Sequence, residues 1–121
     1  MARILIAEDD GDIRDLVTYK LKAEGHQITA TRDGTEAWET CQSSPPELAV
    51  LDVMMPGMTG FEVCGLIKEH PDLGSVRVVL LTARSQADDI ERGYAAGADD
   101  YILKPFSMSD LATRVAAVLE R

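Results

Sequence analysis

The sequence predicts an α/β fold in which a parallel five-stranded sheet lies between two layers of helices. Five short apolar runs alternate with five amphipathic segments along the 121 residues. Three of the runs are apolar on successive residues, which is typical of parallel strands that are covered on both faces. Strict alternation of strands and helices gives right-handed crossovers, so five such units predict a three-layer, doubly wound (βα)5 sandwich.

Each apolar run has the length of one strand. The runs "RILIAE", "ELAVLD" and "VRVVLLT" are nearly continuous in apolar character, whereas "HQITAT" and "DYILK" contain more polar residues. Turn and helix signals separate the five runs from one another. We therefore expect strands over residues 3–8, 26–31, 47–52, 76–82 and 100–104.

The first helix is expected over 11–24 and the second over 35–43. Apolar residues recur in both at the spacing of one helical face, namely Ile13, Leu16, Val17 and Leu21 in the first helix, and Ala37, Trp38 and Cys41 in the second. Gly25 suits the left-handed backbone position that often follows a helix. The pair Pro45-Pro46 would end the second helix.

The other three helices are expected to begin at capping sequences. "TGFE" (59–62) has the Thr-x-x-Glu pattern of a capping box, and it opens a helix that would pack Val63, Leu66 and Ile67. "SQAD" (85–88) and "SMSD" (107–110) have the same pattern with Asp in place of Glu. The last helix repeats apolar residues on one face, at Leu111, Val115, Val118 and Leu119.

Composition indicates one globular domain over residues 1–121. The formal net charge of −9 argues against direct binding of nucleic acid, because phosphate backbones attract Lys and Arg. No apolar run approaches the roughly 20 residues that cross a bilayer, so we expect no membrane segment. Cys41 and Cys64 make no disulfide framework, and we expect reduced thiols in a cytoplasmic protein.

Polar residues follow the predicted strands at their carboxyl ends, where doubly wound sheets bind ligands. Glu8, Asp9 and Asp10 follow the first strand, and Asp52 ends the third. The fourth and fifth strands end at Thr82 and at Lys104-Pro105. The fold would therefore bring several carboxylates, a hydroxyl and an ammonium group to one crevice.

These residue types favour phosphoryl chemistry assisted by a metal. Oxygen donors without His or Cys select a hard cation such as Mg²⁺ or Mn²⁺. Asp52 stands alone at the end of an apolar strand, where a metal-bound carboxylate can attack phosphorus and form an acyl phosphate. Lys104 could neutralise the opposite side of the phosphoryl group.

Four motifs together resemble the receiver domain of bacterial two-component response regulators. They are "ILIAEDD", "LAVLDVMMPGMTGFE", "VVLLTA" and "GADDYILKPF", in this order and over essentially the whole chain. The resemblance implies a flavodoxin-like sheet with strand order 2-1-3-4-5. It also implies that Asp52 is phosphorylated by the phosphohistidine of a sensor kinase or of a phosphotransfer protein. Such a domain catalyses only its own phosphorylation and dephosphorylation.

The resemblance assigns ligands to the metal and to the phosphoryl group. Asp9, Asp52 and the backbone carbonyl of Met54 would bind Mg²⁺, with Glu8 acting through water or a hydrogen bond. Asp10 matches a position that is less regularly acidic in this family. The side chains of Thr82 and Lys104 would contact the phosphoryl oxygens. A cis peptide bond between Lys104 and Pro105 would hold the lysine side chain in position.

The resemblance also implies a switch between Thr82 and Tyr101. Phosphorylation would draw the Thr82 hydroxyl inward, and the Tyr101 ring would follow. This movement would alter the surface formed by the fourth helix, the fifth strand and the fifth helix. That face would control a partner protein or an output domain. The sequence does not decide whether the chain forms a homodimer through this surface. The charge pattern of the subfamily with winged-helix output domains is matched at Asp99, Asp100, Asp110 and Arg114. Ile90 and Ala95 depart from that pattern.

Three other functions remain as alternatives. A phosphate-ester hydrolase could use the same crevice, although Met54 stands where such enzymes usually carry a second acid. A flavin-binding module could share the topology, but "EDDGD" would repel an anionic cofactor. A binding domain that never uses phosphate is disfavoured by the presence of all five residues Glu8, Asp9, Asp52, Thr82 and Lys104.

Overall fold

The computed structural model describes residues 2–83 and 86–121, in which strands and helices alternate as predicted. The strands are β1 (Arg3–Ala7), β2 (Gln27–Thr31), β3 (Leu48–Asp52), β4 (Arg77–Thr82) and β5 (Asp100–Leu103). The helices are α1 (Gly11–Ala23), α2 (Gly34–Ser43), α3 (Gly60–Glu69), α4 (Ala87–Ala95) and α5 (Met108–Leu119). Each strand is one residue shorter than the sequence predicts.

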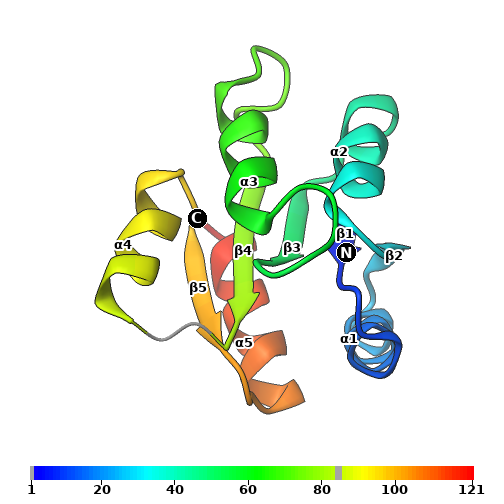
Figure 1. Cartoon of the computed structure of the whole chain (residues 1–121). Helices are drawn as coiled ribbons and strands as arrows, with labels where there is room; N and C mark the ends of the chain where they lie inside the picture. Colours follow the sequence, from blue (N-terminus) through cyan, green and yellow to red (C-terminus); the bar gives the residue numbers. More distant parts are fainter. Residues whose placement is uncertain (1, 84–85) are drawn as a thin grey trace.

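The strands form a parallel sheet in the order β2-β1-β3-β4-β5 (Figure 1). This order confirms the flavodoxin-like topology that the resemblance implies. β3 lies at the centre of the sheet and is buried along its whole length, as its continuous apolar run predicts. Its last residue, Asp52, is therefore carried on the strand that is buried at every position.

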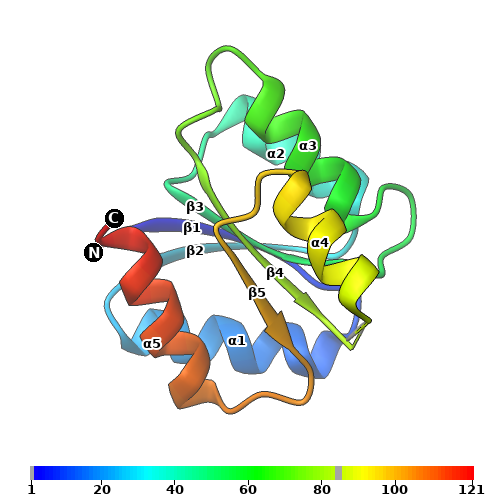
Figure 2. The same cartoon turned by 90° about the vertical axis from the view of Figure 1, so that its left-hand side faces the viewer.

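Helices cover both faces of the sheet (Figure 2), with α1 and α5 on one face and α2, α3 and α4 on the other. Successive strand residues point to opposite faces, so Leu5 packs in the α2–α3–α4 layer and Ile4 and Ile6 pack in the α1–α5 layer. Among the described residues, no helix has both the length and the apolar character that crossing a membrane requires.

Capping contacts fix most of the helix starts. The capping box at Thr59 and Glu62 is confirmed, because each side chain accepts a hydrogen bond from the other's backbone N–H. The hydroxyl of Ser107 likewise accepts the N–H of the third residue after it. α4 begins after Gln86, whose side chain makes no capping hydrogen bond. The capping residue expected there, Ser85, lies outside the described residues.

Two leucines that the helical spacing assigned to buried faces are exposed instead. Leu16 on α1 is 55% exposed and Leu66 on α3 is 36% exposed. Val17 and Leu21 fill the sheet-facing side of α1, so Leu16 is left at the margin of the apolar stripe. Helical spacing predicts which residues share a stripe, but the neighbouring elements determine which edge of that stripe is covered.

Both cysteines are free and buried in the α2–α3–α4 layer. Burial raises the pKa of the Cys41 thiol to about 11 and that of the Cys64 thiol to about 12. The Cys64 thiol lies 3.5 Å from the backbone carbonyl of Ala96, to which it donates a hydrogen bond. Both side chains therefore act as small apolar core residues, because a buried neutral thiol is a poor nucleophile.

Candidate functional site

The parallel register brings the polar strand ends to one edge of the sheet. Asp52 is the last residue of β3 and is aligned with Leu81 on β4. Thr82 ends β4 and is aligned with Leu103 on β5, directly before Lys104. Glu8 and Asp9 follow β1, the other neighbour of β3. The polar residues that the sequence analysis assigned to one crevice thus lie at the same edge of the sheet.

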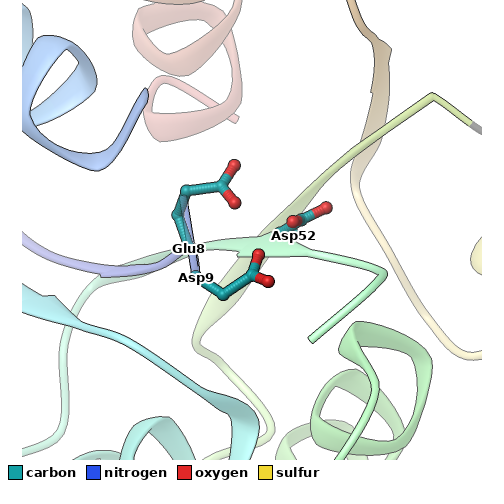
Figure 3. A group of neighbouring side chains, drawn as sticks. All are labelled: Glu8, Asp9 and Asp52. Atoms are coloured by element: carbon teal, nitrogen blue, oxygen red, sulfur yellow. The ribbon is translucent and has the colours of Figure 1, made fainter. Parts of the chain in front are cut away.

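Three carboxylates converge at this edge (Figure 3). One ligand atom from each of Glu8, Asp9 and Asp52 lies within 4.8 Å of the other two. Glu8 and Asp52 are buried, at 1% and 4% exposure, whereas Asp9 is exposed. A buried carboxylate pair is costly unless a cation meets it. The all-oxygen donor set, open on the Asp9 side, fits a hard divalent cation such as Mg²⁺.

Lys104 supplies the positive charge that lies among these acids. Its Nζ donates a hydrogen bond of 2.7 Å to Glu8 Oε1 and lies 3.4 Å from Asp52 Oδ2. The peptide bond from Lys104 to Pro105 is cis, as the resemblance implies. The ammonium therefore bridges the end of β5 to the ends of β1 and β3.

Burial and neighbouring charges shift the pKa of two site residues in the same direction. Burial, together with hydrogen bonding and repulsion from Glu8, raises the pKa of Asp52 to about 7, although Lys104 opposes this rise. Burial alone would lower the pKa of Lys104, but the hydrogen bond to Glu8 and the charge of Asp52 outweigh it and raise that pKa. A cation bound beside Asp52 would favour its ionised form.

The remaining predicted residues lie at or just after the ends of β1, β3 and β4. Thr82 is fully buried at the end of β4. Met54 lies two residues beyond Asp52 in the β3–α3 connection, and its side chain is 54% exposed. Asp10 does not join the carboxylate group: its side chain caps α1 by accepting the N–H groups of the second and third residues after it.

Tyr101 is directed into the molecule from β5. Its side chain is 6% exposed and its ring packs against α4 at Gly93, where a Cβ atom would lie 2.7 Å from Tyr101 Cδ2. The ring of Tyr94, which is 48% exposed, lies 6.4 Å from that of Tyr101 between centroids. The aromatic of the expected switch is thus in its inward position.

The charged residues of the expected dimer face form pairs within the chain. Arg114 on α5 contacts Asp100 at 3.2 Å and Asp110 at 3.3 Å. Asp99 contacts Lys68 at 3.2 Å. Asp99, Asp100, Asp110 and Arg114 therefore each have a charged partner within the chain.

Sequence reasoning missed two features that shape the site. Arg14 on α1 donates a 2.9 Å hydrogen bond to the backbone carbonyl of Glu8, which fixes the chain directly after β1. Gly34 begins α2 where a Cβ atom would overlap the Met58 carbonyl, and Gly60 begins α3 against the Asp52 carbonyl. The pairs Asp33-Gly34 and Thr59-Gly60 in the sequence are compatible with these close contacts. The same pairs are equally typical of ordinary turns.

An apolar groove of about 400 Å³ lies next to Lys104. It runs between the start of α1 and the β5–α5 connection, and is lined by Ile13, Leu16, Ala83, Pro105, Phe106 and Met108. The exposed Leu16 forms part of its wall. Exposed apolar surface of this kind, beside a polar site, is typical of a contact with another molecule.

Comparison with known proteins identifies the family. The family model of the response regulator receiver domain matches residues 4–116. The phosphate regulon transcriptional regulatory protein PhoB of Rhizobium meliloti is 38% identical over 121 residues, which are 100% of this chain and 53% of that protein. The DNA-binding response regulator MtrA of Mycobacterium tuberculosis is 40% identical over 119 residues, 98% of this chain and 51% of that protein.

The fold agrees with that of a solved receiver domain. The BeF3-activated DrrB receiver domain superposes with a TM-score of 0.90 at 35% identity, covering 100% of this chain and 99% of that one. The chain spans about half the length of the curated relatives it matches. On the sequence match, the fold and the convergent strand ends, this chain belongs to the family of response regulator receiver domains.

Proposed function

We propose that this chain is a phosphoacceptor, in which Asp52 takes a phosphoryl group from the phosphohistidine of a sensor kinase or of a phosphotransfer protein. One observation carries the proposal: the buried Asp52 carboxylate ends the central strand with ligand atoms of Glu8 and Asp9 within 4.8 Å and Lys104 Nζ at 3.4 Å. The arrangement combines a carboxylate nucleophile, a cation site and a fixed ammonium group.

The residues divide the chemistry among them. A carboxylate oxygen of Asp52 forms the new bond to phosphorus while the phosphorus–nitrogen bond of the donor breaks, and the electron pair of that bond stays on the imidazole. Asp9, Asp52 and the Met54 carbonyl would hold Mg²⁺ or Mn²⁺, with Glu8 behind them. Bound there, the metal would offset charge on the phosphoryl oxygens, so catalysis is positioning and charge neutralisation.

Lys104 and Thr82 would stabilise the transferred group on its other side. The ammonium already lies between Glu8 and Asp52, so it can turn to a phosphoryl oxygen with little movement. The Thr82 hydroxyl would donate a hydrogen bond to another oxygen. Tyr101 lies inward against Gly93, and we infer that phosphorylation increases the population of this arrangement.

The donor protein would dock in the apolar groove between α1 and the β5–α5 connection. Lys104 lines the groove and contacts Glu8 and Asp52, so a protein seated there would bring its phosphohistidine close to these carboxylates. The groove is apolar, and Ile13 in its wall follows the two acidic residues Asp10 and Asp12 at the start of α1. A helical face with apolar residues and basic flanks would match this surface.

On this proposal the chain signals to other proteins and catalyses only its own phosphorylation and dephosphorylation. The α4–β5–α5 face would control a downstream protein or output domain, and homodimerisation through it remains a second use of the face. The net charge of −9 disfavours direct contact with nucleic acid. Cys41 and Cys64 are free and buried, as expected of a cytoplasmic protein with reduced thiols.

The test is phosphorylation by a small donor. Acetyl phosphate with Mg²⁺ is expected to add one phosphoryl group, seen by intact-protein mass, as an acid-stable and hydroxylamine-labile acyl phosphate. Asp52→Asn should abolish the adduct, whereas the exposed Asp72→Asn is the matched control and should keep it. Equal labelling of the Asp52 variant would refute the assignment. Saturable multiple turnover of a phosphate monoester would indicate the hydrolase alternative instead.

A further inference from the structure

Helix α4 is held to the rest of the molecule by few side chains. Among its described residues Gly93 is buried, and Ile90 is partly buried and packs on the core. The other residues of α4 are exposed or half-buried. An element with so few buried contacts can be shifted by the gain or loss of one of them.

One of these contacts joins α4 to the start of α3. The guanidinium carbon of Arg92 lies 4.6 Å from the centroid of the Phe61 ring, within the range of a cation–π interaction. Phe61 is 5% exposed, so its ring is a fixed surface rather than a mobile one. α3 and α4 lie side by side on the same face of the sheet (Figure 2).

The start of α3 is in turn packed against the phosphoacceptor residue. Gly60, which precedes Phe61, donates its N–H to the Val53 carbonyl at 3.0 Å. A Cβ atom at Gly60 would lie 2.5 Å from the Asp52 carbonyl oxygen and 2.9 Å from Val53 Cα. The first turn of α3 therefore touches the backbone of Asp52 without intervening side chains, and a shift of that backbone must move Phe61.

The residue after Arg92 contacts the expected switch. Gly93 leaves room for the Tyr101 ring, because a Cβ there would approach the ring to 2.7 Å. Arg92 and Gly93 are consecutive, so one position of α4 satisfies both contacts. The α4 position that accommodates the inward Tyr101 ring is the one that places Arg92 over Phe61.

We propose that Arg92 is a positioning residue: by binding the Phe61 ring it couples the backbone at Asp52 to α4, and stabilises the arrangement in which Tyr101 is inward. This inference rests on the proposed phosphoacceptor function. It adds a connection between the site and the α4–β5–α5 face that runs through the start of α3 and is separate from Thr82. Coupling is reciprocal, so the contact must also strengthen binding of a phosphoryl mimic at Asp52.

The size of the effect is limited by the strength of the contact. An exposed cation–π pair supports a change of about two- to fivefold in an equilibrium constant. Arg92→Ala is therefore expected to weaken the affinity for beryllofluoride with Mg²⁺ by about two- to fivefold. It should also raise the solvent exposure of Tyr101. Protein labelled with 3-fluorotyrosine reports this exposure through the ¹⁹F solvent isotope shift, and the Tyr101→Phe variant identifies the resonance of Tyr101.

A double-mutant cycle separates coupling from a general loss of stability. Phe61→Leu should have the same effect as Arg92→Ala, and the double variant should be no weaker than either single one. Arg92→Lys keeps the charge but loses the planar guanidinium, and should fall between wild type and Arg92→Ala. Arg32→Ala, at an exposed arginine after β2, is the matched control and should match wild type. Thermal unfolding checks that each variant is folded.

The outcomes separate this inference from the function on which it rests. If the variants accept phosphoryl from acetyl phosphate but Arg92→Ala leaves both beryllofluoride affinity and Tyr101 exposure unchanged, the inference is wrong and the phosphoacceptor function stands. Additive effects of the two single variants would likewise overturn the coupling. If wild type accepts no phosphoryl group and binds no beryllofluoride, the function and the inference fail together.

Discussion

Lys104 and Glu8 form a 2.7 Å hydrogen-bonded ion pair although 96 positions separate them in the chain. The Glu8 side chain is 1% exposed, so its charge is balanced by the ammonium and not by bulk water. The same Nζ lies 3.4 Å from Asp52. The run of acids directly after β1 is thus tolerated because Lys104, the residue after β5, brings a positive charge to the same edge of the sheet.

Removing this cation should be costly. Lys104→Met leaves the buried carboxyl groups of Glu8 and Asp52 facing each other, and loss of one partner of a buried pair costs about 3–5 kcal/mol. Urea unfolding at neutral pH without divalent ions measures this loss. Lys20→Met, at an exposed pair with Glu24, is the control and should cost less than about 1 kcal/mol. Similar losses in both variants would show that Lys104 is not the stabilising cation.

The raised pKa of Asp52 predicts how stability depends on pH. A carboxyl group whose folded pKa is raised to about 7 holds its proton more tightly in the folded state. That contribution is fully present below the ordinary pKa of about 4 and is lost as pH rises through about 7. In the absence of Mg²⁺, wild type should therefore lose stability over this window.

Asp52→Asn isolates the effect because it removes the titrating group and keeps the size of the side chain. The variant should be more stable than wild type above about pH 7, by on the order of 4 kcal/mol at most, and the gap should narrow toward pH 4. Urea unfolding across this range measures the gap. A gap that widens toward low pH would contradict the raised pKa.

Much of the fold and site could be predicted because the rules involved are local or topological. Alternating apolar runs and helical stripes predict the element order, and parallel strands place their carboxyl ends at one edge. Asp52, Thr82 and Lys104 could therefore be brought together from sequence alone. The capping box at Thr59 and the left-handed Gly25 follow from the chemistry of single residues.

The rest depends on how elements pack, which periodicity does not encode. Val17 and Leu16 are adjacent members of one apolar stripe, yet Val17 is fully buried and Leu16 is 55% exposed, because α1 turns Val17 toward the sheet. Likewise, the sequence places Lys104 near several acids, but only side-chain geometry shows that Glu8 accepts its hydrogen bond. The contact of Arg92 with Phe61 joins two helices whose relative position no local pattern specifies.

The adjacent acids Asp9 and Asp10 should differ in their effect on the metal. Asp9 belongs to the carboxylate group, whereas Asp10 caps α1. Asp9→Asn is expected to weaken Mg²⁺ binding by about tenfold or more. Asp10→Asn should leave it unchanged, because Asn also caps helices well. The Mg²⁺ dependence of the melting temperature gives both affinities. Equal weakening in the two variants would rule out a distinct metal role for Asp9.

The groove beside Lys104 predicts a selective effect of Leu16. Leu16→Glu places a charge in an apolar wall and should slow phosphoryl transfer from a phosphohistidine protein by about tenfold, since burying a leucine contributes roughly 1.5–3 kcal/mol. Transfer from acetyl phosphate should be unaffected, because that donor needs no docking surface. Leu66→Glu, at an exposed leucine on α3, is the control. Slowing with both donors would place the defect in the site itself.

Two glycines of α3 should respond in opposite ways to alanine. Nothing lies within 4 Å of a Cβ atom at Gly65, so Gly65→Ala should stabilise the fold by about 0.5–1 kcal/mol through helix propensity alone. At Gly60 the same methyl group would lie 2.5 Å from the Asp52 carbonyl oxygen, which is backbone and cannot turn aside.

Gly60→Ala must therefore move either α3 or the end of β3. We expect it to lower both the free energy of unfolding and the rate of phosphorylation by acetyl phosphate, whereas Gly65→Ala should leave that rate unchanged. Urea unfolding and intact-protein mass measure the two quantities on the same samples. If Gly60→Ala lost stability but kept the wild-type rate, the approach of α3 to Asp52 would support the fold without positioning the carboxyl group for chemistry.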